Sequence, residues 1–142
     1  MMLGKTYDQM AVGDSATFSK TITETDITLF GAISGDFNPA HMDAEYAATT
    51  KFEKRIAHGM IATSLISGLL GMKLPGAGTI YLDQYVKFTA PVYIGDTITA
   101  KVEVVEKLAR NRVKMITTVS NQNGVSVLEG EANILAPRAP KL

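Results

Sequence analysis

Residues 59–73 read GMIATSLISGLLGMK and carry no charged side chain before Lys73. The large apolar members of this stretch are Ile61, Leu65, Ile66, Leu69, Leu70 and Met72. These side chains fall on every side of a helical wheel, which predicts a helix that the rest of the domain buries all round. Pro75 and the glycines around it predict where this helix ends. We therefore expect the fold to be built around one long apolar helix.

After residue 79 the apolar residues recur at every second position, which is the spacing of a β-strand with one buried face. In the first such run, Ile80, Leu82, Val86 and Phe88 are expected to share the buried face, and Gln84 interrupts it. The connections between the runs are too short for parallel crossovers, so the strands should form an antiparallel meander. The predicted strands cover residues 80–89, 97–104, 113–119 and 125–135.

The first third of the chain carries signals for the start and end of helices. Thr23, with Asp26 three residues later, predicts an N-terminal cap, and Gly35 predicts the end of that helix. A second short helix is expected over residues 43–48, and a strand over 16–22 precedes both helices. Helices on one side of an antiparallel sheet define an α+β fold, with the sheet wrapped around the apolar helix.

The composition fits one soluble domain over residues 1–142. Fourteen basic and fourteen acidic residues cancel, so no net charge attracts nucleic acid or an anionic membrane surface. The chain has no cysteine, which excludes disulfides, thiol nucleophiles and thiolate metal sites. Its longest uncharged stretch, residues 59–72, is shorter than the ~20 apolar residues of a membrane span. Since the N-terminus also lacks a signal-peptide pattern, we expect a cytoplasmic protein.

The segment SGDFNPAH, residues 34–41, places Asp36 and His41 on either side of an Asn-Pro turn. A carboxylate and an imidazole can together hold and activate a water molecule near neutral pH. In the alternative interpretation, Asp36 accepts a backbone N–H in an Asx turn and His41 is a surface residue. The spacing alone favours this alternative, because a carboxylate and an imidazole five positions apart form a weak pattern.

The predicted apolar helix carries two further polar features. Gly59 lies at its N-terminus, where free N–H groups and the positive end of the helix dipole can polarise a carbonyl oxygen. A glycine required there for steric reasons is the alternative. Ser67 and Thr63 lie four residues apart within the helix, where hydroxyls commonly donate to a carbonyl one turn earlier.

Other chemistries find little support in the sequence. No serine lies in a G-x-S-x-G elbow, and no glycine motif for phosphate or dinucleotide binding occurs. His41, Asp43 and Glu45 alternate, but no second cluster completes a coordination shell. We therefore expect no bound metal.

Residues 30–41, FGAISGDFNPAH, followed by Ala47, resemble the hydratase-2 signature of MaoC-like, (R)-specific enoyl-CoA hydratases. The similarity is closest to the short, single-domain hydratases that supply polyhydroxyalkanoate synthesis. Ala40 departs from the signature, which usually has a larger aliphatic residue at that packing position. The similarity covers most of the chain and continues through residues 48–50, 58–60, 67–71, 74–76, 80–82, 88, 91–92 and 95–96.

The resemblance implies a fold, a reaction and a partner. The fold is the hot-dog fold, in which an antiparallel sheet wraps a long central helix, and relatives work as homodimers. The reaction is the reversible addition of water to trans-2-enoyl-CoA, which gives (R)-3-hydroxyacyl-CoA in fatty acid and polyhydroxyalkanoate metabolism. CoA is then part of the substrate, and no separate cofactor is expected.

The resemblance also implies roles for single residues. Asp36 acts as a base on the water, while His41 helps to orient the water and passes a proton towards C2. Gly59 donates its backbone N–H to the thioester carbonyl, and Asn38 and Ser67 support the site. The residues that could line the acyl pocket are Leu65, Leu69 and Leu70, which core packing explains equally well.

Three other functions fit the same pattern. A hot-dog acyl-CoA thioesterase would release free CoA thiol. A 3-hydroxyacyl-carrier-protein dehydratase would act on a different thioester carrier. An acyl-CoA sensing module would bind without turnover, and would need a DNA-binding helix or a partner domain that these 142 residues do not show.

Overall fold

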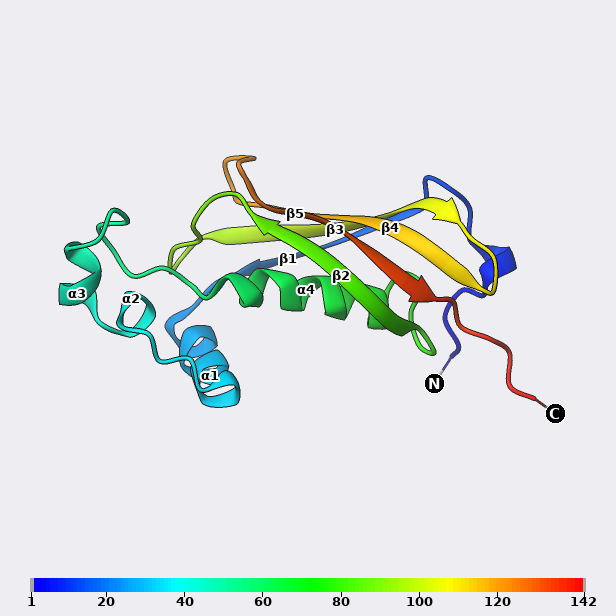
Figure 1. Ribbon diagram of the computed structural model, residues 1–142, viewed down its shortest axis with the longest axis horizontal. Helices are drawn as coiled ribbons and strands as arrows, with labels where there is room; N and C mark the ends of the chain where they lie inside the picture. Colours follow the sequence, from blue (N-terminus) through cyan, green and yellow to red (C-terminus); the bar gives the residue numbers. More distant parts are fainter. Residues whose placement is uncertain (1, 142) are drawn as a thin grey trace.

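The computed structural model describes residues 2–141 as a five-stranded antiparallel sheet with its helices on one side. The longest helix, α4, runs beneath the sheet, and the three shorter α-helices gather at one end (Figure 1). This is the hot-dog arrangement that the sequence predicts. In chain order the elements are η1 (Tyr7–Gln9), β1 (Ser15–Thr21), α1 (Glu24–Ser34), α2 (Pro39–Met42), α3 (Ala44–Ala48), α4 (Gly59–Met72), β2 (Ile80–Phe88), β3 (Thr97–Lys107), β4 (Arg112–Ser120) and β5 (Ser126–Leu135).

The strand order is β1-β3-β4-β5-β2, so the sheet is only partly a meander. β3, β4 and β5 follow one another as predicted. β2 pairs with β5 instead of β3 and forms an edge of the sheet. Residues 89–96 therefore pass the ends of two strands, a distance of about 15 Å that a short extended connection can span. The prediction that all later strands form one meander is wrong at β2.

β2 contains a bulge that changes which of its side chains face inward. Its register with β5 shifts between Tyr81 and Asp83, and such a shift exchanges the faces of the strand. Tyr81 and Gln84 lie opposite buried residues of β5, whereas Ile80 and Leu82 are 55% and 45% exposed. The expected buried face of β2 is therefore wrong at Ile80 and Leu82, because simple alternation contains no bulge.

α4 is buried on one face only. Its opposite face is open in the single chain, where Met60 and Met72 are 50% and 74% exposed. The prediction of a helix buried all round is therefore wrong, because one sheet covers only one side of a helix. With 14 residues it is the longest helix, and among residues 2–141 no helix is long and apolar enough to cross a membrane. The buried face consists of Ile61, Ala62, Leu65, Ile66, Leu69 and Leu70.

The ends of the short helices follow local capping rules. Thr23 and Asp26 form the predicted capping box at the start of α1, and Gly35 ends that helix with a φ of 76°. Asp43 caps α3 through its side chain. The sequence did not predict α2, a single helical turn that Asn38 caps by accepting the Ala40 N–H. Because α2 includes position 41, this turn sets where the imidazole points.

Candidate active site

Three chemically active side chains meet where the short helices reach the N-terminus of α4. Asp36 comes from the loop after α1, His41 from α2, and His58 from the residue that precedes α4. One potential ligand atom from each lies within 4.8 Å of the others. The structure thus brings the predicted Asp36–His41 pair together and adds a second imidazole.

Asp36 uses its two carboxylate oxygens for different purposes. Oδ1 accepts the backbone N–H of Asn38 at 3.1 Å, which is the Asx turn considered in the alternative interpretation. Oδ2 lies 3.9 Å from Nε2 of His41. That separation is too long for a direct hydrogen bond but suits one bridging water. The turn and the dyad geometry therefore coexist.

His41 is held by its other ring nitrogen. Nδ1 lies 2.7 Å from the carbonyl oxygen of Ile56, so Nδ1 must carry the proton and donate it. In the neutral ring, Nε2 is then the free acceptor, directed towards Asp36. The His41 side chain is only 12% exposed, against 48% for Asp36. His41 is therefore not the surface residue of the alternative interpretation.

The segment 55–58 contacts this site in several ways that the sequence did not predict. Arg55 donates from Nε to the His41 carbonyl at 2.6 Å and forms a two-pronged ion pair with Glu24 of α1. The Ile56 N–H donates to the Ala40 carbonyl at 3.2 Å. These links join residues 14 to 31 positions apart in the sequence. No local motif marks Arg55.

His58 is a site residue for which the sequence indicated no role. It is 3% exposed, and its Nε2 lies 2.8 Å from the carbonyl oxygen of Asp36. Its ring centroid lies 4.0 Å from that of His41 and 4.7 Å from that of Phe30. Two signals were available: residues 58–60 belong to the family resemblance, and the chain has two histidines, both of which lie here.

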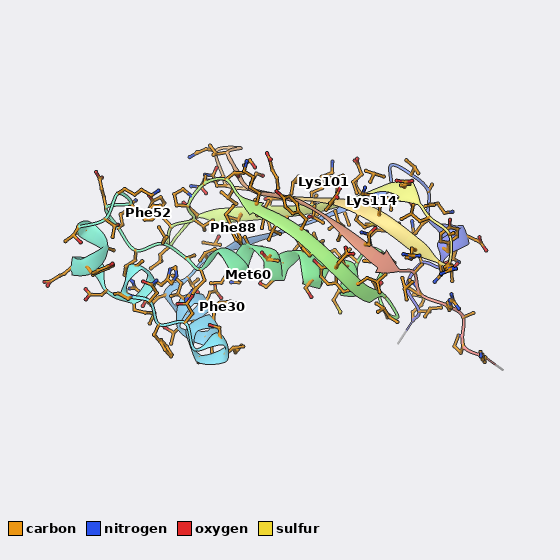
Figure 2. The ribbon with its side chains drawn as sticks, in the orientation of Figure 1. Phe30, Phe52, Met60, Phe88, Lys101 and Lys114 are labelled. Carbon is orange, nitrogen blue, oxygen red and sulfur yellow. The ribbon has the colours of Figure 1, made fainter. Side chains whose placement is uncertain are left out.

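A cavity of about 440 Å³ opens beside the dyad. His41 and Gly59 line it, together with apolar side chains from several elements. Figure 2 shows Phe52, Met60 and Phe88 on the side of the molecule where the short helices lie. A pocket with one polar end and apolar walls suits a molecule that has a polar head and an acyl chain. The main apolar lining residues are Phe52, Ile56, Met60, Phe88, Val92 and Val127.

Gly59 combines both interpretations that the sequence left open. A Cβ at this position would lie 2.8 Å from Cε1 of Phe88, so there is a steric reason for glycine. Gly59 is also the first residue of α4, and among the described residues its N–H has no hydrogen-bond acceptor. The geometry therefore leaves a free donor at the positive end of a helix, facing the pocket.

Other predicted site residues lie elsewhere. Ser67 is exposed on the outer face of α4, with no hydrogen bond to Asp36 or His41 among the described residues. The Thr63 hydroxyl is buried without a partner there, so neither side chain shows the backbone bond considered above. Three predicted acyl-pocket residues belong to the core and do not line the 440 Å³ cavity; they are Leu65, Leu69 and Leu70.

The cluster is better arranged to hold water than a metal ion. Nδ1 of His41 and Nε2 of His58 both donate to carbonyl groups, so neither is free as a ligand. The two rings lie face to face with a tilt of 32°, and in-plane lone pairs of such rings do not converge on one point. Oδ2 of Asp36 and Nε2 of His41, 3.9 Å apart, are placed to share one small molecule, while Nδ1 of His58 is buried without a partner among the described residues.

Comparisons with known proteins agree with this arrangement. The family model described as "MaoC like domain" matches residues 9–125. An (R)-specific enoyl-CoA hydratase of Rhodospirillum rubrum is 46% identical over 131 residues, which cover 92% of this chain and 91% of that protein. One from Aeromonas caviae is 44% identical over 129 residues, covering 90% and 96%.

A solved structure is also similar to this chain over nearly its whole length. The unliganded R-hydratase PhaJ1 from Pseudomonas aeruginosa superposes with a TM-score of 0.90 at 48% identity, covering 98% of this chain and 94% of that one. The family model spans the dyad, the start of α4 and most of the sheet. This chain therefore belongs to the family of proteins with a MaoC-like domain.

Proposed function

We propose that this protein is an (R)-specific enoyl-CoA hydratase, which adds water reversibly across the double bond of trans-2-enoyl-CoA. The observation that carries the proposal is the 3.9 Å separation of Asp36 Oδ2 and His41 Nε2, beside a pocket that Gly59 lines. Two relatives with more than 40% identity carry the same activity in their names. The product is (R)-3-hydroxyacyl-CoA.

The two free atoms of the dyad define how the water reacts. A water between Asp36 and His41 loses a proton to the pair as its oxygen bonds to C3, and a proton is delivered to C2. The two groups share this proton, so they act as a coupled pair. We propose that Asp36 takes the proton from the water while Nε2 of His41 helps to orient it. That proton then passes through Nε2 of His41 to C2, so both groups return to their starting forms. Asn38 keeps the Asp36 carboxylate in place through the bond to Oδ1.

Gly59 is proposed to stabilise the charge that develops during the reaction. As C3 is attacked, negative charge moves towards the thioester oxygen, and a backbone N–H at a helix N-terminus stabilises it. One such donor typically lowers the barrier by about 3–4 kcal/mol. The acyl chain is proposed to extend among Met60, Phe88 and Val127, in place of the core leucines that the sequence suggested.

The test is a hydration assay with crotonyl-CoA and longer trans-2-enoyl-CoA substrates. The conjugated enoyl-thioester absorbance should fall, and chiral analysis should find the R product. His41→Ala should lose most turnover while keeping its circular dichroism spectrum; full activity in that variant would contradict the dyad. Repeating the assay with enoyl groups on acyl carrier protein decides the carrier.

The same assay separates hydration from thioester cleavage. A thioesterase would release CoA thiol, which a thiol reagent detects without background because the chain has no cysteine. Hydration is redox-neutral and, as proposed, uses only groups of the protein, so chelator treatment should leave the rate unchanged. Because CoA thioesters are made and used inside cells, we place the reaction in the cytoplasm, which cell fractionation can check.

We also propose a homodimer, formed through β2 and the outer face of α4. β2 is an edge strand, and its side chains Ile80, Leu82 and Tyr85 are 55%, 45% and 62% exposed. Met72 on α4 is 74% exposed. An open apolar edge of this kind is normally covered, and twofold symmetry allows each copy to cover the other. Ser67 lies on this same outer face of α4. Its proposed support of the active site would therefore act through the dimer interface.

A further inference from the structure

We propose that His58 is a positioning residue of the reaction, which holds the Asp36 loop in register with the N-terminus of α4. The proposal rests on the proposed hydratase function and adds a residue to it. His58 would not exchange protons with the substrate. Its task would be to keep the base and the Gly59 N–H at a constant separation.

The hydrogen bond from His58 links the Asp36 loop, residues 34–38, to the start of α4. The Asp36 N–H donates to Ser34 Oγ, and Asp36 Oδ1 accepts from the Asn38 N–H, so both bonds are local. Among the described residues, the bond from His58 Nε2 to the Asp36 carbonyl, at 2.8 Å, is the one that ties residues 34–38 to a distant part of the chain. The half-exposed Asp36 side chain gains no other anchor from the core.

The ionisation form of His58 follows from its surroundings. A carbonyl oxygen only accepts, so Nε2 must carry a proton. Within residues 2–141, Nδ1 is buried without a partner, and a second N–H there would be a buried donor without an acceptor. The neutral ring with the proton on Nε2 is therefore the form that fits. His41 has the opposite tautomer, because its Nδ1 donates to Ile56.

The ring of His58 also limits where His41 can move. The two ring centroids lie 4.0 Å apart, and Phe30 packs against His58 at 4.7 Å. A packed neighbour on this side keeps the His41 ring plane, and hence the direction of Nε2, constant. His58 thus touches both members of the dyad, one through its N–H and the other through its ring.

The position of His58 next to Gly59 explains why its contacts with Asp36 and His41 affect the reaction. It directly precedes Gly59, the proposed donor to the thioester oxygen, while its side chain holds Asp36. Water must attack C3 while negative charge develops on the thioester oxygen. Asp36 and the Gly59 N–H must therefore be held at a fixed separation. A misplacement of about 1 Å in such a site can reduce the rate about 100-fold.

The test compares two replacements that each keep one property of His58. His58→Phe keeps the ring but loses the N–H, and we expect kcat to fall about 100-fold, by the cost of misplacement, with KM little changed. His58→Gln keeps an N–H donor of similar reach. If the hydrogen bond to the Asp36 carbonyl positions the loop, this variant should retain at least about a tenth of wild-type kcat. Wild-type kcat in His58→Phe, or equal loss in both variants, would overturn the proposal.

Thr117→Val serves as the matched control. Thr117 is fully buried and accepts a hydrogen bond from Gln84 at 2.8 Å, but it does not line the pocket. This variant should lose thermal stability and keep wild-type kcat. If it loses kcat as His58→Phe does, the loss reflects a weakened fold and the positioning role is refuted.

Nitrogen NMR of the histidines tests the hydrogen bond independently of activity. The chain has only two histidines, so ¹⁵N labelling of histidine gives four ring signals, assigned with His58→Phe. We expect His58 protonated at Nε2 and His41 at Nδ1 at neutral pH. The opposite or a mixed tautomer for His58 would overturn the proposal. Inactive wild-type protein with the expected tautomers would instead refute the proposed function.

Discussion

At the scale of single residues, Asp36 shows how one side chain can satisfy a structural and a chemical requirement together. Its Oδ1 closes an Asx turn and its Oδ2 faces His41. The sequence presented these as competing interpretations, because a spacing cannot show that a carboxylate has an oxygen for each. Gly59 combines a steric and a chemical role in the same way.

The double role of Asp36 makes Asp36→Asn an informative variant. The amide oxygen of Asn can still accept the Asn38 N–H, so the turn and the fold should survive. The base is lost, and kcat should fall by about 10²–10⁴ in the crotonyl-CoA assay. Asp43→Asn, at the cap of α3, makes the same chemical change outside the site and should keep full turnover. Equal activity in the two variants would contradict the role of Asp36.

Replacing Gly59 tests the packing around the proposed oxyanion donor. The added Cβ of Gly59→Ala would lie 2.8 Å from the Phe88 ring, so this ring, which lines the pocket, must shift. We expect a marked loss of kcat/KM for crotonyl-CoA with the fold retained. Adding Phe88→Leu should restore part of the activity by making room for the new methyl group. No recovery in the double variant would show that the clash with Phe88 is not the cause.

At the scale of elements, the dyad depends on a short segment before α4 that has no regular structure of its own. Residues 55–58 donate to or accept from the backbone or side chains of positions 36, 40 and 41. These polar bonds join α1 and α2 to the segment before α4. Apolar packing adds to them, since Ile27 of α1 is fully buried in the core, Met42 of α2 packs against the core, and Phe30 packs on His58.

Arg55→Met should show how much this segment contributes. It removes the bond to the His41 carbonyl and leaves that carbonyl partly buried without its donor, so we expect reduced kcat and a lower melting temperature. Glu24→Gln is the matched control, because it weakens the ion pair but leaves Arg55 Nε bonded to His41. Glu24 is the exposed member of this pair, at 60%, and pairs with an exposed partner typically contribute about 0.2–1 kcal/mol. A larger loss of kcat in Glu24→Gln than in Arg55→Met would refute this account.

The start of α1 carries a pH-dependent contribution to stability. Burial alone raises the pKa of Asp26, but hydrogen bonds from Lys20 and from Thr23 outweigh it, so the pKa lies below its ordinary value. A carboxyl with a lowered pKa in the folded state stabilises the fold above its unfolded pKa and loses this effect as the pH falls through the folded pKa. Asp26→Ala should therefore cost about 1 kcal/mol at pH 7 and less at pH 3, as measured by urea unfolding. An equal cost at both values would contradict it.

At the scale of the whole molecule, one sheet and one central helix leave two apolar surfaces uncovered. The outer face of α4 and the edge strand β2 both expose large apolar side chains. The face of the sheet turned away from α4 carries Lys101 and Lys114 (Figure 2), which form ion pairs with Glu103 and Glu131. The asymmetry between these surfaces is the physical basis for the proposed dimer.

Charged substitutions on β2 and on the outer face of α4 should dissociate the proposed dimer into monomers. Leu82→Glu on β2 and Met72→Glu on α4 should shift the mass from dimer to monomer in light scattering after size exclusion. Ile116→Glu is the control, since Ile116 on the central strand β4 is similarly exposed, at 38%, away from both surfaces. A wild-type monomer, or dissociation by the control alone, would contradict the proposed interface.

The sequence by itself determined most of the elements and the family, and through the family signature it indicated the dyad. Helix caps, strand alternation and the residue 30–41 signature are encoded within a few neighbouring positions, where local sterics and hydrogen bonds decide the outcome. Only the tertiary structure decided the place of β2 at the edge, the exposed face of α4, and the contacts of Arg55 and His58 with the dyad. The contacts of Arg55 and His58 join residues 14 to 31 positions apart, and the pairing of β2 with β5 joins residues still farther apart, such as Ile80 and Leu135. No local period or motif carries that information, because the free energy of such contacts is set by packing between elements.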